Sequence, residues 1–506
     1  MQFKHLLTIA SVVTLTSCSK YFDKDYWGNK PGSKNEDPST FQEIASIDIG
    51  EAGAAEITAF DPSTNRLFVV NNGGVNKIDV IDGNNPSALS VIASIDLAKY
   101  TGAVNSLDVH DGILAAAIEN GDKQQPGKVV IFNTKTYAEI KVIPVGALPD
   151  MITFSPDGKY ILIANEGEPS SDYTNDPKGT VSIISVKNGF SVVNLDFSAF
   201  ASKVDALKLK GLRMFGPNAS FAQDMEPEYI TVSKDSKTAW VTLQENNAIA
   251  KIDLNSKSIT DLFPLGFKNY NTENSAIDPS DKDNQVAFRK VPVYGMYQPD
   301  AIAVLHKNNI PYLFTVNEGD VREYNAFAEA KRVSAITLDP TAFPNAAQLQ
   351  DPAQLGRLNI TTTLGDDNKD GKYEALFSFG ARSFSVWNGL SGQQVYDCGN
   401  SLEKAVVAAG YYDDNRSDDK GVEPEGITLG EVGGKDIAFV GMERADAVAV
   451  YNVSNPTSPK LLQILKTGDA PEGVLFISAK ESPINKSLLV VSSEDDGVIK
   501  IYAPAK

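Results

Sequence analysis

Acidic residues at both ends of a predicted β-hairpin are the first feature of this sequence that could do chemistry. In "LPDMITFSPDGKYILIANEGEP", Leu148 to Pro169, Asp150 precedes one apolar run, and Glu166 and Glu168 follow the next. The Pro-Asp-Gly-Lys between the two runs is a turn sequence, so the runs are predicted to pair as antiparallel strands. The start of the first strand and the end of the second lie side by side in such a hairpin, which places Asp150 and Glu166 at the same end.

The same order of proline, acid, strand, turn, strand and glutamate recurs along the chain. Clear copies begin at Pro227, Pro299, Pro424 and Pro471. Looser copies are "AEITAFDPSTNRLFVVNN", "NSLDVHDGILAAAIEN" and "YEALFSFGARSFSVWNG", the last at residues 373–389. Together with the first hairpin, these copies make eight candidate units of roughly 40 to 50 residues.

Hairpins at this spacing, each usually followed by one or two more strands, predict an all-β fold built as a single β-propeller over residues 41–506. Seven or eight blades fit the repeat, and the count favours eight. A lone strand predicted at residues 41–50 would complete the last blade and close the ring. A row of tandem β-sandwich domains is the alternative fold, although no linkers separate the units. Insertions are predicted near residues 196–224, 266–296, 340–358 and 403–422, the last being acidic and expected to be mobile.

The repeated acids are predicted to form a negative ring on one face, because the first strand of each propeller blade lines the central channel. Some of these acids must then be protonated, paired with arginine or lysine, or bound to cations. Arg322 and Arg444 closely follow Glu318 and Glu443 and are the expected pairing partners. Capping of backbone amides is the alternative role for any single acid. The predicted ligand-binding face consists of Asp150, Glu166, Glu168, Glu228, Glu245, Asp300, Glu318, Asp320, Arg322, Glu425, Glu443, Glu472 and Glu494.

The stretch "DDNKDGKYE" is the most metal-like motif in the chain. Asp366, Asn368 and Asp370 stand at positions one, three and five and are followed by glycine, which is the spacing of oxygen ligands in a calcium loop. The acid expected at position twelve is missing, and Glu374 at position nine is its candidate substitute. A plain solvated turn is the alternative.

The N-terminus carries a predicted lipoprotein signal. Residues 1–17 contain a lysine, a short apolar run and the sequence Leu-Thr-Ser, which with the following cysteine resembles a bacterial lipobox. Cleavage before Cys18 and lipidation of that residue are expected, and residues 18–40 read as a flexible tether. The expected location is the bacterial cell envelope, lipid-anchored at the outer membrane and facing either the periplasm or the outside. An ordinary cleaved signal is the alternative.

The composition argues against several other functions. The net charge of −19 and the scarcity of histidine (3) and cysteine (2) disfavour nucleic-acid binding and a His/Cys zinc site. No phosphate-binding loop, dinucleotide fingerprint or G-x-S-x-G motif is present, so no nucleotide, flavin or haem is expected and Ca²⁺ is the candidate cofactor. The chain is predicted to be a monomer that binds a small ligand or metal ion, with another envelope protein as a further candidate partner.

Several stretches together resemble the choice-of-anchor I family, among them "EPEYITVSKDSKTAWVTLQENNAIAKID", "FTVNEGDVREY", "DGKYEALFSFGARSFSVWNG" and "GDAPEGVLFI". The resemblance covers nearly all of residues 41–504. The family is similar to mesenchyme-specific cell-surface glycoproteins of biomineralising animals, which implies a secreted or surface-attached propeller and calcium handling. Its pattern around residues 366–374 is richer in acids than this copy, which has Asn368 and Lys369. Some members carry an alkaline phosphatase label.

Two functions follow as hypotheses. The first is a non-enzymatic, lipid-anchored propeller that binds a ligand or Ca²⁺ at its acidic face. The alternative is a metal-dependent phosphoesterase, similar to an alkaline phosphatase or a phytase, in which the same carboxylates hold metal ions that clamp a phosphoryl group. Glu166, Glu168, Asp320 and Arg322 would be its first candidate residues.

Overall fold

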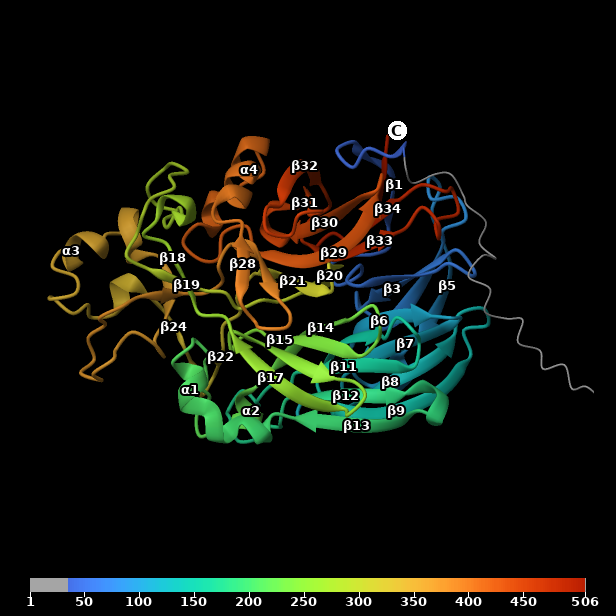
Figure 1. Ribbon diagram of the computed structural model, residues 1–506, viewed down its shortest axis with the longest axis horizontal. Helices are drawn as coiled ribbons and strands as arrows, with labels where there is room; N and C mark the ends of the chain where they lie inside the picture. The colour runs from blue at the N-terminus through green and yellow to red at the C-terminus, as the bar shows by residue number, and fades with distance from the viewer. Residues whose placement is uncertain (1–34, 506) are drawn as a thin grey trace, which may run out of the picture.

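The computed structural model describes residues 35–505, and their architecture is all-β, built from four-stranded antiparallel sheets (Figure 1). The predicted signal, Cys18 and most of the predicted tether lie outside the described residues. Seven four-stranded sheets are present in the described part. These sheets consist of β2 (Thr58–Asp61), β3 (Arg66–Asn71), β4 (Lys77–Asp82) and β5 (Ser90–Asp96); β6 (Val104–His110), β7 (Ile113–Ile118), β8 (Pro126–Asn133) and β9 (Glu139–Ala147); β10 (Pro149–Phe154), β11 (Tyr160–Asn165), β12 (Thr180–Ser185) and β13 (Ser191–Asp196); β14 (Pro227–Val232), β15 (Thr238–Leu243), β16 (Ala248–Asp253) and β17 (Ser258–Pro264); β20 (Ile302–Lys307), β21 (Ile310–Asn317), β27 (Ser383–Asn388) and β28 (Gln394–Asp397); β29 (Pro424–Val432), β30 (Lys435–Met442), β31 (Ala447–Asn452) and β32 (Lys460–Lys466); and β33 (Pro471–Ile477), β34 (Leu488–Ser493), β35 (Val498–Pro504) and β1 (Phe41–Asp48).

The sheets follow one another around a centre, and the chain colour in Figure 1 runs from blue through green to red around that centre. The first strands of successive sheets pack against each other in the order β2, β6, β10, β14, β20, β29 and β33, and β33 packs against β2. This is the blade arrangement of a β-propeller. Tandem sandwiches do not describe it, because each sheet packs against the next one in the series rather than pairing off with a single partner.

The strands have the hydrophobic patterns that these positions require. The inner strands, such as β11 (YILIAN) and β34 (LLVVSS), are buried along almost their whole length, because a neighbouring sheet covers each face. The outer strands, such as β5 (SVIASID), are largely exposed. The core therefore lies between successive sheets; one cluster joins Leu162 and Ile183 of one sheet to Val241 and Ile252 of the next.

The N-terminal strand completes the sheet formed by the C-terminal strands. β1 pairs antiparallel with β35, and Phe41, which is buried, packs edge-to-face against Phe439 with ring centroids 5.2 Å apart. Glu36 is also buried and accepts hydrogen bonds from the amide and hydroxyl groups of Ser487 at 2.8 and 2.7 Å. At least this part of the range predicted as a tether is therefore packed against the sheets.

The candidate unit at residues 373–389 does not form a sheet of its own, so the described chain has seven four-stranded sheets where the repeat count favours eight. Its second half is β27, which pairs with β21 as the third strand of the β20 sheet. Its first half contributes Phe377 and Ser378 to a separate side lobe. In sequence, the two halves look like the two strands of one hairpin. In the structure they do not pair with each other, because β27 pairs with β21, from which a long insertion separates it.

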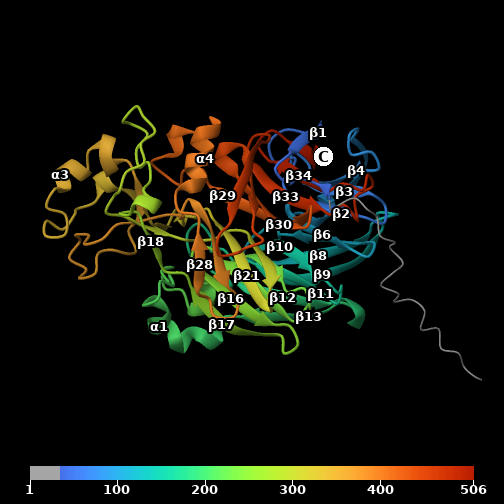
Figure 2. The same ribbon diagram turned by 45° about the horizontal axis from the view of Figure 1, so that its top comes forward.

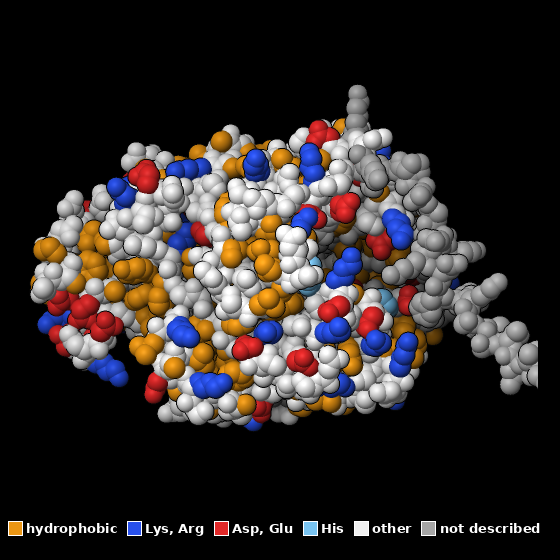
Figure 3. Space-filling model, in the orientation of Figure 1, with side chains coloured by type: hydrophobic (Ala, Val, Ile, Leu, Met, Phe, Trp, Pro, Cys, Tyr) orange, Lys and Arg blue, Asp and Glu red, His pale blue; other side chains and the backbone are white. Residues whose placement is uncertain are grey.

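The side lobe projects from the sheets at the left of Figures 1 and 2. It has its own core, which includes Tyr270, Val293, Val333 and Leu358, and in Figure 3 acidic side chains gather at its outer end. Its strands and the neighbouring short strands are β18 (Phe267–Asn269), β19 (Tyr294–Met296), β22 (Glu323–Tyr324), β23 (Phe327–Ala328), β24 (Ala330–Arg332), β25 (Asn359–Thr361) and β26 (Phe377–Ser378).

The helical segments are short and lie mostly in the insertions. They are η2 (Ala98–Tyr100), η3 (Val186–Asn188), η4 (Ser198–Lys203), α1 (Val204–Lys208), α2 (Phe221–Asp224), η5 (Glu273–Ser275), η6 (Val333–Ala335), α3 (Ala346–Leu349), η7 (Pro352–Gly356), α4 (Ser401–Ala409), η8 (Asp414–Arg416) and η9 (Glu443–Ala445). None of the helices in the described range has the length and apolar character needed to cross a bilayer.

The acidic insertion near residues 403–422 is packed against the rest of the protein. The part of the insertion that follows α4 is held by the buried Arg382. This side chain donates hydrogen bonds to the carbonyl groups of Ser417 at 2.7 Å and Asp419 at 2.8 Å. Ser417 itself is fully buried. These contacts differ from the mobility expected from its composition, and they fix the segment that carries Lys420.

Candidate functional site

A bulge in the backbone presents the acid near the start of four of the five clear repeats. In the β10 sheet the pairing shifts between Pro149 and Ile152, so that Asp150 and Met151 oppose a single residue of β11. The pairing also shifts after the prolines that open β14, β29 and β33. A bulge re-aims side chains away from the regular alternation of a strand, and bulges are common beside active sites.

The residue before the proline has a left-handed backbone in four of the five clear repeats, all but the one that opens at Pro227. The φ angles of Leu148, Gln298, Glu423 and Ala470 are 47°, 41°, 48° and 55°. A non-glycine residue in this conformation costs on the order of 1 kcal/mol, and such strain clusters at functional sites. The strain recurs immediately ahead of the acids, at one end of the sheets.

The acids that follow these prolines meet in one cavity. We call the residues at this position of the seven sheets the inner ring: Glu56, Asn105, Asp150, Glu228, Asp300, Glu425 and Glu472. A cavity of about 220 Å³ is lined by six of them, all but Glu56, together with Glu318 and Asp320. The structure thus brings together the five inner-ring residues that the sequence assigned to the channel mouth.

Burial and mutual repulsion disfavour the ionised form of these carboxyl groups. Burial, reinforced by the nearby Glu168, raises the pKa of Asp150 to about 6. Burial, with repulsion by Glu494 and Asp150, raises the pKa of Glu56 to about 8 even though Asn72 donates a hydrogen bond to it. Burial followed by repulsion also holds the pKa values of the remaining inner-ring acids well above their usual range, namely Glu228, Asp300, Glu425 and Glu472.

Three groups of carboxylates approach closely enough to share a metal ion. Within the described residues, one oxygen of each member lies within 4.8 Å of the others. We call Glu166, Glu228 and Glu245 the open cluster, Asp300, Glu318 and Glu425 the middle cluster, and Glu318, Glu423 and Glu443 the lysine cluster. Each cluster combines residues from two successive sheets, and Glu318 belongs to two clusters.

The open cluster is not neutralised. In the part of the chain that the structure describes, Glu166, Glu228 and Glu245 form no ion pair, and the Oε2 atoms of Glu228 and Glu245 are buried without a hydrogen-bond donor. Glu245 is only 3% exposed. Burial, followed by repulsion from neighbouring acids inside and outside the cluster, raises all three pKa values well above the usual range.

The lysine cluster, by contrast, is filled by side-chain cations. Lys420 forms ion pairs with Glu318 and, at 3.1 Å, with Glu423. Arg444 pairs with Glu443 at 2.8 Å, which confirms that expected partner. Burial alone would lower the pKa of Lys420, but the neighbouring glutamates Glu318 and Glu423 raise it.

Arg322 does not pair with Glu318, and that expectation is wrong. Arg322 is buried and contacts Asp224 at 2.7 Å and Glu226 at 2.6 Å. The insertion that carries Asp224 folds back toward Arg322. The distance between these two residues along the sequence gave no indication of this contact. The nearest acid along the chain was therefore a poor guide to the partner.

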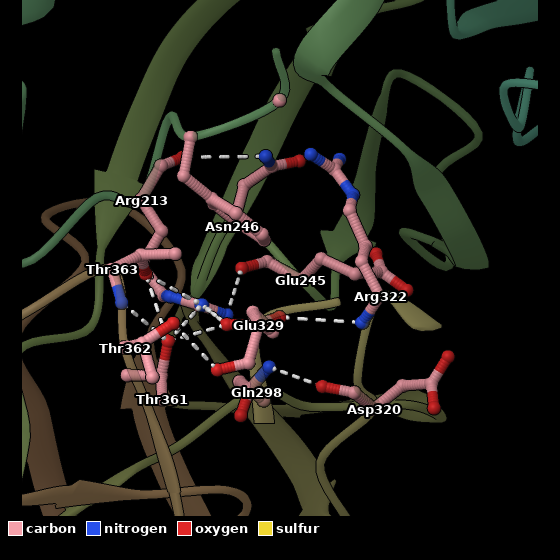
Figure 4. Close-up of polar contacts among 12 residues, drawn as sticks. Arg213, Glu245, Asn246, Gln298, Asp320, Arg322, Glu329, Thr361, Thr362 and Thr363 are labelled. Atoms are coloured by element: carbon pink, nitrogen blue, oxygen red, sulfur yellow. Dashed lines mark hydrogen bonds and ion pairs between the residues drawn. The ribbon is translucent and has the colours of Figure 1, made fainter. Parts of the chain in front are cut away.

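A second buried arginine lies on the other side of Glu245 (Figure 4). Arg213 pairs with Glu329 and donates a hydrogen bond to the carbonyl oxygen of Glu245 at 2.9 Å. Arg213 and Arg322 both stack on the ring of Phe215, at 4.0 and 4.4 Å from its centroid. These arginines are occupied by their own acids, so they fix the backbone near the open cluster without pairing with its carboxylates.

The remaining predicted residues lie around this mouth. Glu168 accepts a hydrogen bond from the hydroxyl of Tyr324 at 3.2 Å, and Asp320 lines the cavity. Burial raises the pKa of Glu494, and Asp495 raises it further. All three belong to the loops at the same end of the sheets as the inner ring.

The predicted calcium loop is an exposed turn closed by its own hydrogen bonds. The two carboxylate oxygens of Asp366 accept from the amides of Asp370 at 3.1 Å and Gly371 at 3.0 Å. The carboxylate of Glu374 accepts from the side chain of Asn368 at 2.8 Å. Among the described residues this loop does not bring three carboxylates within 4.8 Å of one another, and metal binding there stays a prediction.

Sequence reasoning missed several residues of the mouth. Glu226 and Glu423 each precede a proline that is followed by glutamate, so a repeated Glu-Pro-Glu at residues 226–228 and 423–425 was an available signal. Glu56 stands at the matching position of a looser repeat in the sequence, but it was not included in the predicted ligand-binding face. Lys420 lies 102 residues from Glu318 and gave no signal.

Two curated animal proteins are similar to this chain. Gigasin-3a of Magallana gigas is 29% identical over 188 residues, covering 30% of this chain and 66% of that protein. The mesenchyme-specific cell surface glycoprotein of Strongylocentrotus purpuratus is 24% identical over 355 residues, covering 58% of this chain and 45% of that protein. The chain therefore spans less than two thirds of the length of either relative.

Solved structures show a weaker similarity. A chain of Kuenenia stuttgartiensis hydrazine synthase is 13% identical with a TM-score of 0.48, covering 90% of this chain and 96% of that chain. The WD40 domain of Toxoplasma gondii coronin is 8% identical with a TM-score of 0.49, covering 93% of this chain and 88% of that chain. No functional parallel follows at this level of similarity.

A family model gives the clearest assignment. The model for the choice-of-anchor I domain matches residues 56–456, a range that includes the inner ring up to Glu425 and all three clusters. Since this match spans well over half of the sequence, the protein belongs to the choice-of-anchor I domain family.

Proposed function

We propose that this protein is a cell-surface propeller of seven blades, closed by β1, that binds a divalent cation at the open cluster without catalysing a reaction. The observation that carries the proposal is the set of three carboxylates, Glu166, Glu228 and Glu245, which have no ion-pair partner in the described chain. Glu245 is buried and the other two are partly buried, and the Oε2 atoms of Glu228 and Glu245 are buried without a hydrogen-bond donor. Burying carboxylates without a counter-charge is costly, and a bound cation would remove both the cost and the mutual repulsion.

The donor set favours a hard cation. Carboxylate oxygens suit Ca²⁺, Mg²⁺ and Mn²⁺ rather than metals that prefer sulfur or imidazole. Ca²⁺ tolerates irregular geometry and several carboxylates, whereas Mg²⁺ demands a nearly ideal octahedron. Three acids from two different sheets, one in a strand and two in the loops that follow strands, therefore support Ca²⁺ as the first candidate.

The location is proposed from three independent features. The family is named for its choice of anchors, and one relative is named a cell surface glycoprotein. The N-terminal lipobox sequence ending at Cys18 supplies a matching anchor, a lipid attached outside the described residues. Together they support a lipid-anchored protein of the bacterial cell envelope.

Calorimetric titration of Ca²⁺ into the chelator-treated full chain tests the binding proposal. Wild-type protein is expected to bind Ca²⁺ and to gain thermal stability, because a ligand of the native state stabilises it. Glu245→Gln should abolish this binding, and Glu119→Gln is the matched control, since Glu119 lies on the same rim but pairs with Lys123 at 3.7 Å. Equal binding by the wild type and Glu245→Gln would rule out the open cluster.

The phosphoesterase alternative has less support. It relies on Arg322 to contact a phosphoryl group, and that guanidinium is 3% exposed and paired with Asp224 and Glu226. A panel of phosphomonoesters and phytate, assayed with Ca²⁺, Mn²⁺ and iron, distinguishes the two functions. Hydrolysis that disappears in chelator and in Glu245→Gln would favour catalysis over binding alone.

A further inference from the structure

Lys420 is held in place as a cation of the channel mouth. Its side chain is 12% exposed, and its ammonium forms ion pairs with Glu318 and Glu423. The segment that carries it is tied down by Arg382 and also by Arg332, which donates to the carbonyl oxygen of Asp418 at 2.9 Å. The position of the ammonium is therefore set by the fold rather than by a free surface side chain.

The middle cluster beside it is only partly neutralised. One carboxylate oxygen of Glu318 pairs with Lys420, and the other accepts a hydrogen bond from Gln244 at 2.9 Å. Within the described chain, Asp300 and Glu425 have no ion-pair partner, and the Oε2 atom of Glu425 is buried without a hydrogen-bond donor. A carboxylate that has an unpartnered, buried oxygen and lies within 4.8 Å of two other carboxylates suits cation coordination better than capping of backbone amides.

An ion can reach the middle cluster from the channel. Asp300, Glu318 and Glu425 all line the cavity of about 220 Å³, whereas Glu423 and Lys420 do not. A cation in the cavity would therefore meet the three carboxylates from a space that the lysine does not line. It would compete with the ammonium for Glu318.

We propose that Asp300, Glu318 and Glu425 form a second divalent-cation site, and that Lys420 restrains it by holding Glu318 as a tethered counter-cation. The inference extends the proposed cation binding to a different set of side chains. Binding there is weak while the ammonium pairs with Glu318, because two cations close together repel each other and divide one carboxylate between them.

Lys420→Met tests the restraint, because methionine keeps the aliphatic stem and removes the charge. In a Ca²⁺ titration of the chelator-treated full chain, this variant is expected to bind one more cation than the wild type. If the wild type already binds a second cation, the variant should bind it at least about tenfold more tightly. Lys420→Arg keeps the charge and should behave as wild type. Lys123→Met removes an exposed lysine from the same rim and should also leave the second site unchanged.

The Glu166→Gln background separates this proposal from the first one. Loss of the open cluster should leave the gain caused by Lys420→Met intact, whereas a further Glu425→Gln change should remove that gain. If wild type binds no Ca²⁺ at the open cluster but Lys420→Met still acquires a site, only the earlier proposal fails. A folded Lys420→Met protein with no gained cation overturns the second site, and so does a gain that survives Glu425→Gln. Lys420→Gln repeats the measurement if the methionine variant does not fold.

Discussion

The two sides of the channel mouth carry similar acids but differ in their cations. On the open side, Glu166, Glu228 and Glu245 meet without a positive partner in the described chain. On the side formed by the β20 and β29 sheets, Lys420 and Arg444 pair with Glu318, Glu423 and Glu443. The repeat therefore supplies acids on both sides, and only one side is neutralised by the protein itself.

The insertions account for this difference. The insertion that contains Lys420 brings a positive charge that pairs with Glu318 and Glu423 at the mouth. The insertion beside the open cluster brings Arg213 and Asp224, and with Arg322 and Glu329 these residues neutralise one another. In a rigid repeat scaffold, the inserted loops decide which of the repeated acids remain available to a ligand.

The largest expected effect concerns Arg322, whose role is to neutralise the buried Asp224 and Glu226. Arg322→Met leaves Asp224 and Glu226 buried without a partner, so the free energy of unfolding should fall by about 3–5 kcal/mol. Arg444→Met removes an arginine that is 37% exposed, and the loss should stay below about 1 kcal/mol. Urea unfolding of the two variants measures both values.

A second change shows which acid Arg322 serves. Glu226→Gln should recover part of the stability lost in Arg322→Met, because it removes one of the uncompensated charges. Glu245→Gln should recover much less. The opposite ranking would mean that Arg322 neutralises the open cluster, and the contrast between the two sides would then disappear.

The next effect is the pH dependence of stability without cations. Burial and repulsion raise the pKa of Asp150 to about 6 and of Glu443 to about 7. A carboxyl whose pKa is raised on folding keeps its proton after the unfolded chain has lost it, so its stabilising contribution is complete below the unfolded pKa and is lost as the pH rises. Stability in chelator should therefore fall between about pH 4 and pH 8, by about 1–3 kcal/mol for Asp150 alone.

Calcium should flatten part of this profile, because a cation bound at the open cluster would replace the protons on its three acids, whose pKa values are also raised. Unfolding temperatures measured at pH 5 and pH 8, each with chelator and with saturating Ca²⁺, test this expectation. Stability that rises with pH in chelator would show that the acids are compensated already in the protein.

A smaller effect is expected from a single charge on the open side. Glu228→Gln keeps the shape of the side chain but removes one of three mutually repelling carboxylates, so the cation-free protein should gain about 1 kcal/mol. The same variant should lose the stabilisation by Ca²⁺. Glu119→Gln should do neither, and a destabilised Glu228→Gln protein would indicate that Glu228 caps backbone amides instead.

Local sequence patterns predicted much of the site but few of its ion pairs. The proline-acid starts of β10, β14 and β33 recur in sequence, and the bulges that aim Asp150, Glu228 and Glu472 follow the same repeat. The pairing of β1 with β35 could also be predicted from the sequence. A lone strand ahead of the first repeat can pair with the free edge of the last sheet and so close the ring. Each of these features depends on residues close together in the chain.

The features that sequence reasoning missed depend on long insertions. β27 completes the β20 sheet only after the chain has formed most of the side lobe, so its apolar run read as an independent unit. Lys420 and Asp224 reach their partners from insertions whose path no local pattern defines. The structure was therefore needed for two properties, namely the number of sheets and the ion-pair partner of each acid.

The smallest effect is expected at the exposed loop that resembles a calcium site. Its acids already accept backbone hydrogen bonds, and Asp370 also pairs with Lys372 at 3.2 Å, so they lack the uncompensated burial that marks the open cluster. Asp370→Asn should change the free energy of unfolding by less than about 0.5 kcal/mol, as expected of an exposed site, and should leave the number of bound Ca²⁺ ions unchanged. Calorimetric titration beside Glu245→Gln provides the comparison. If Asp370→Asn loses a cation and Glu245→Gln does not, then ligand spacing in an exposed turn outweighs unneutralised burial, and the contrast between the two sides of the mouth has no bearing on cation binding.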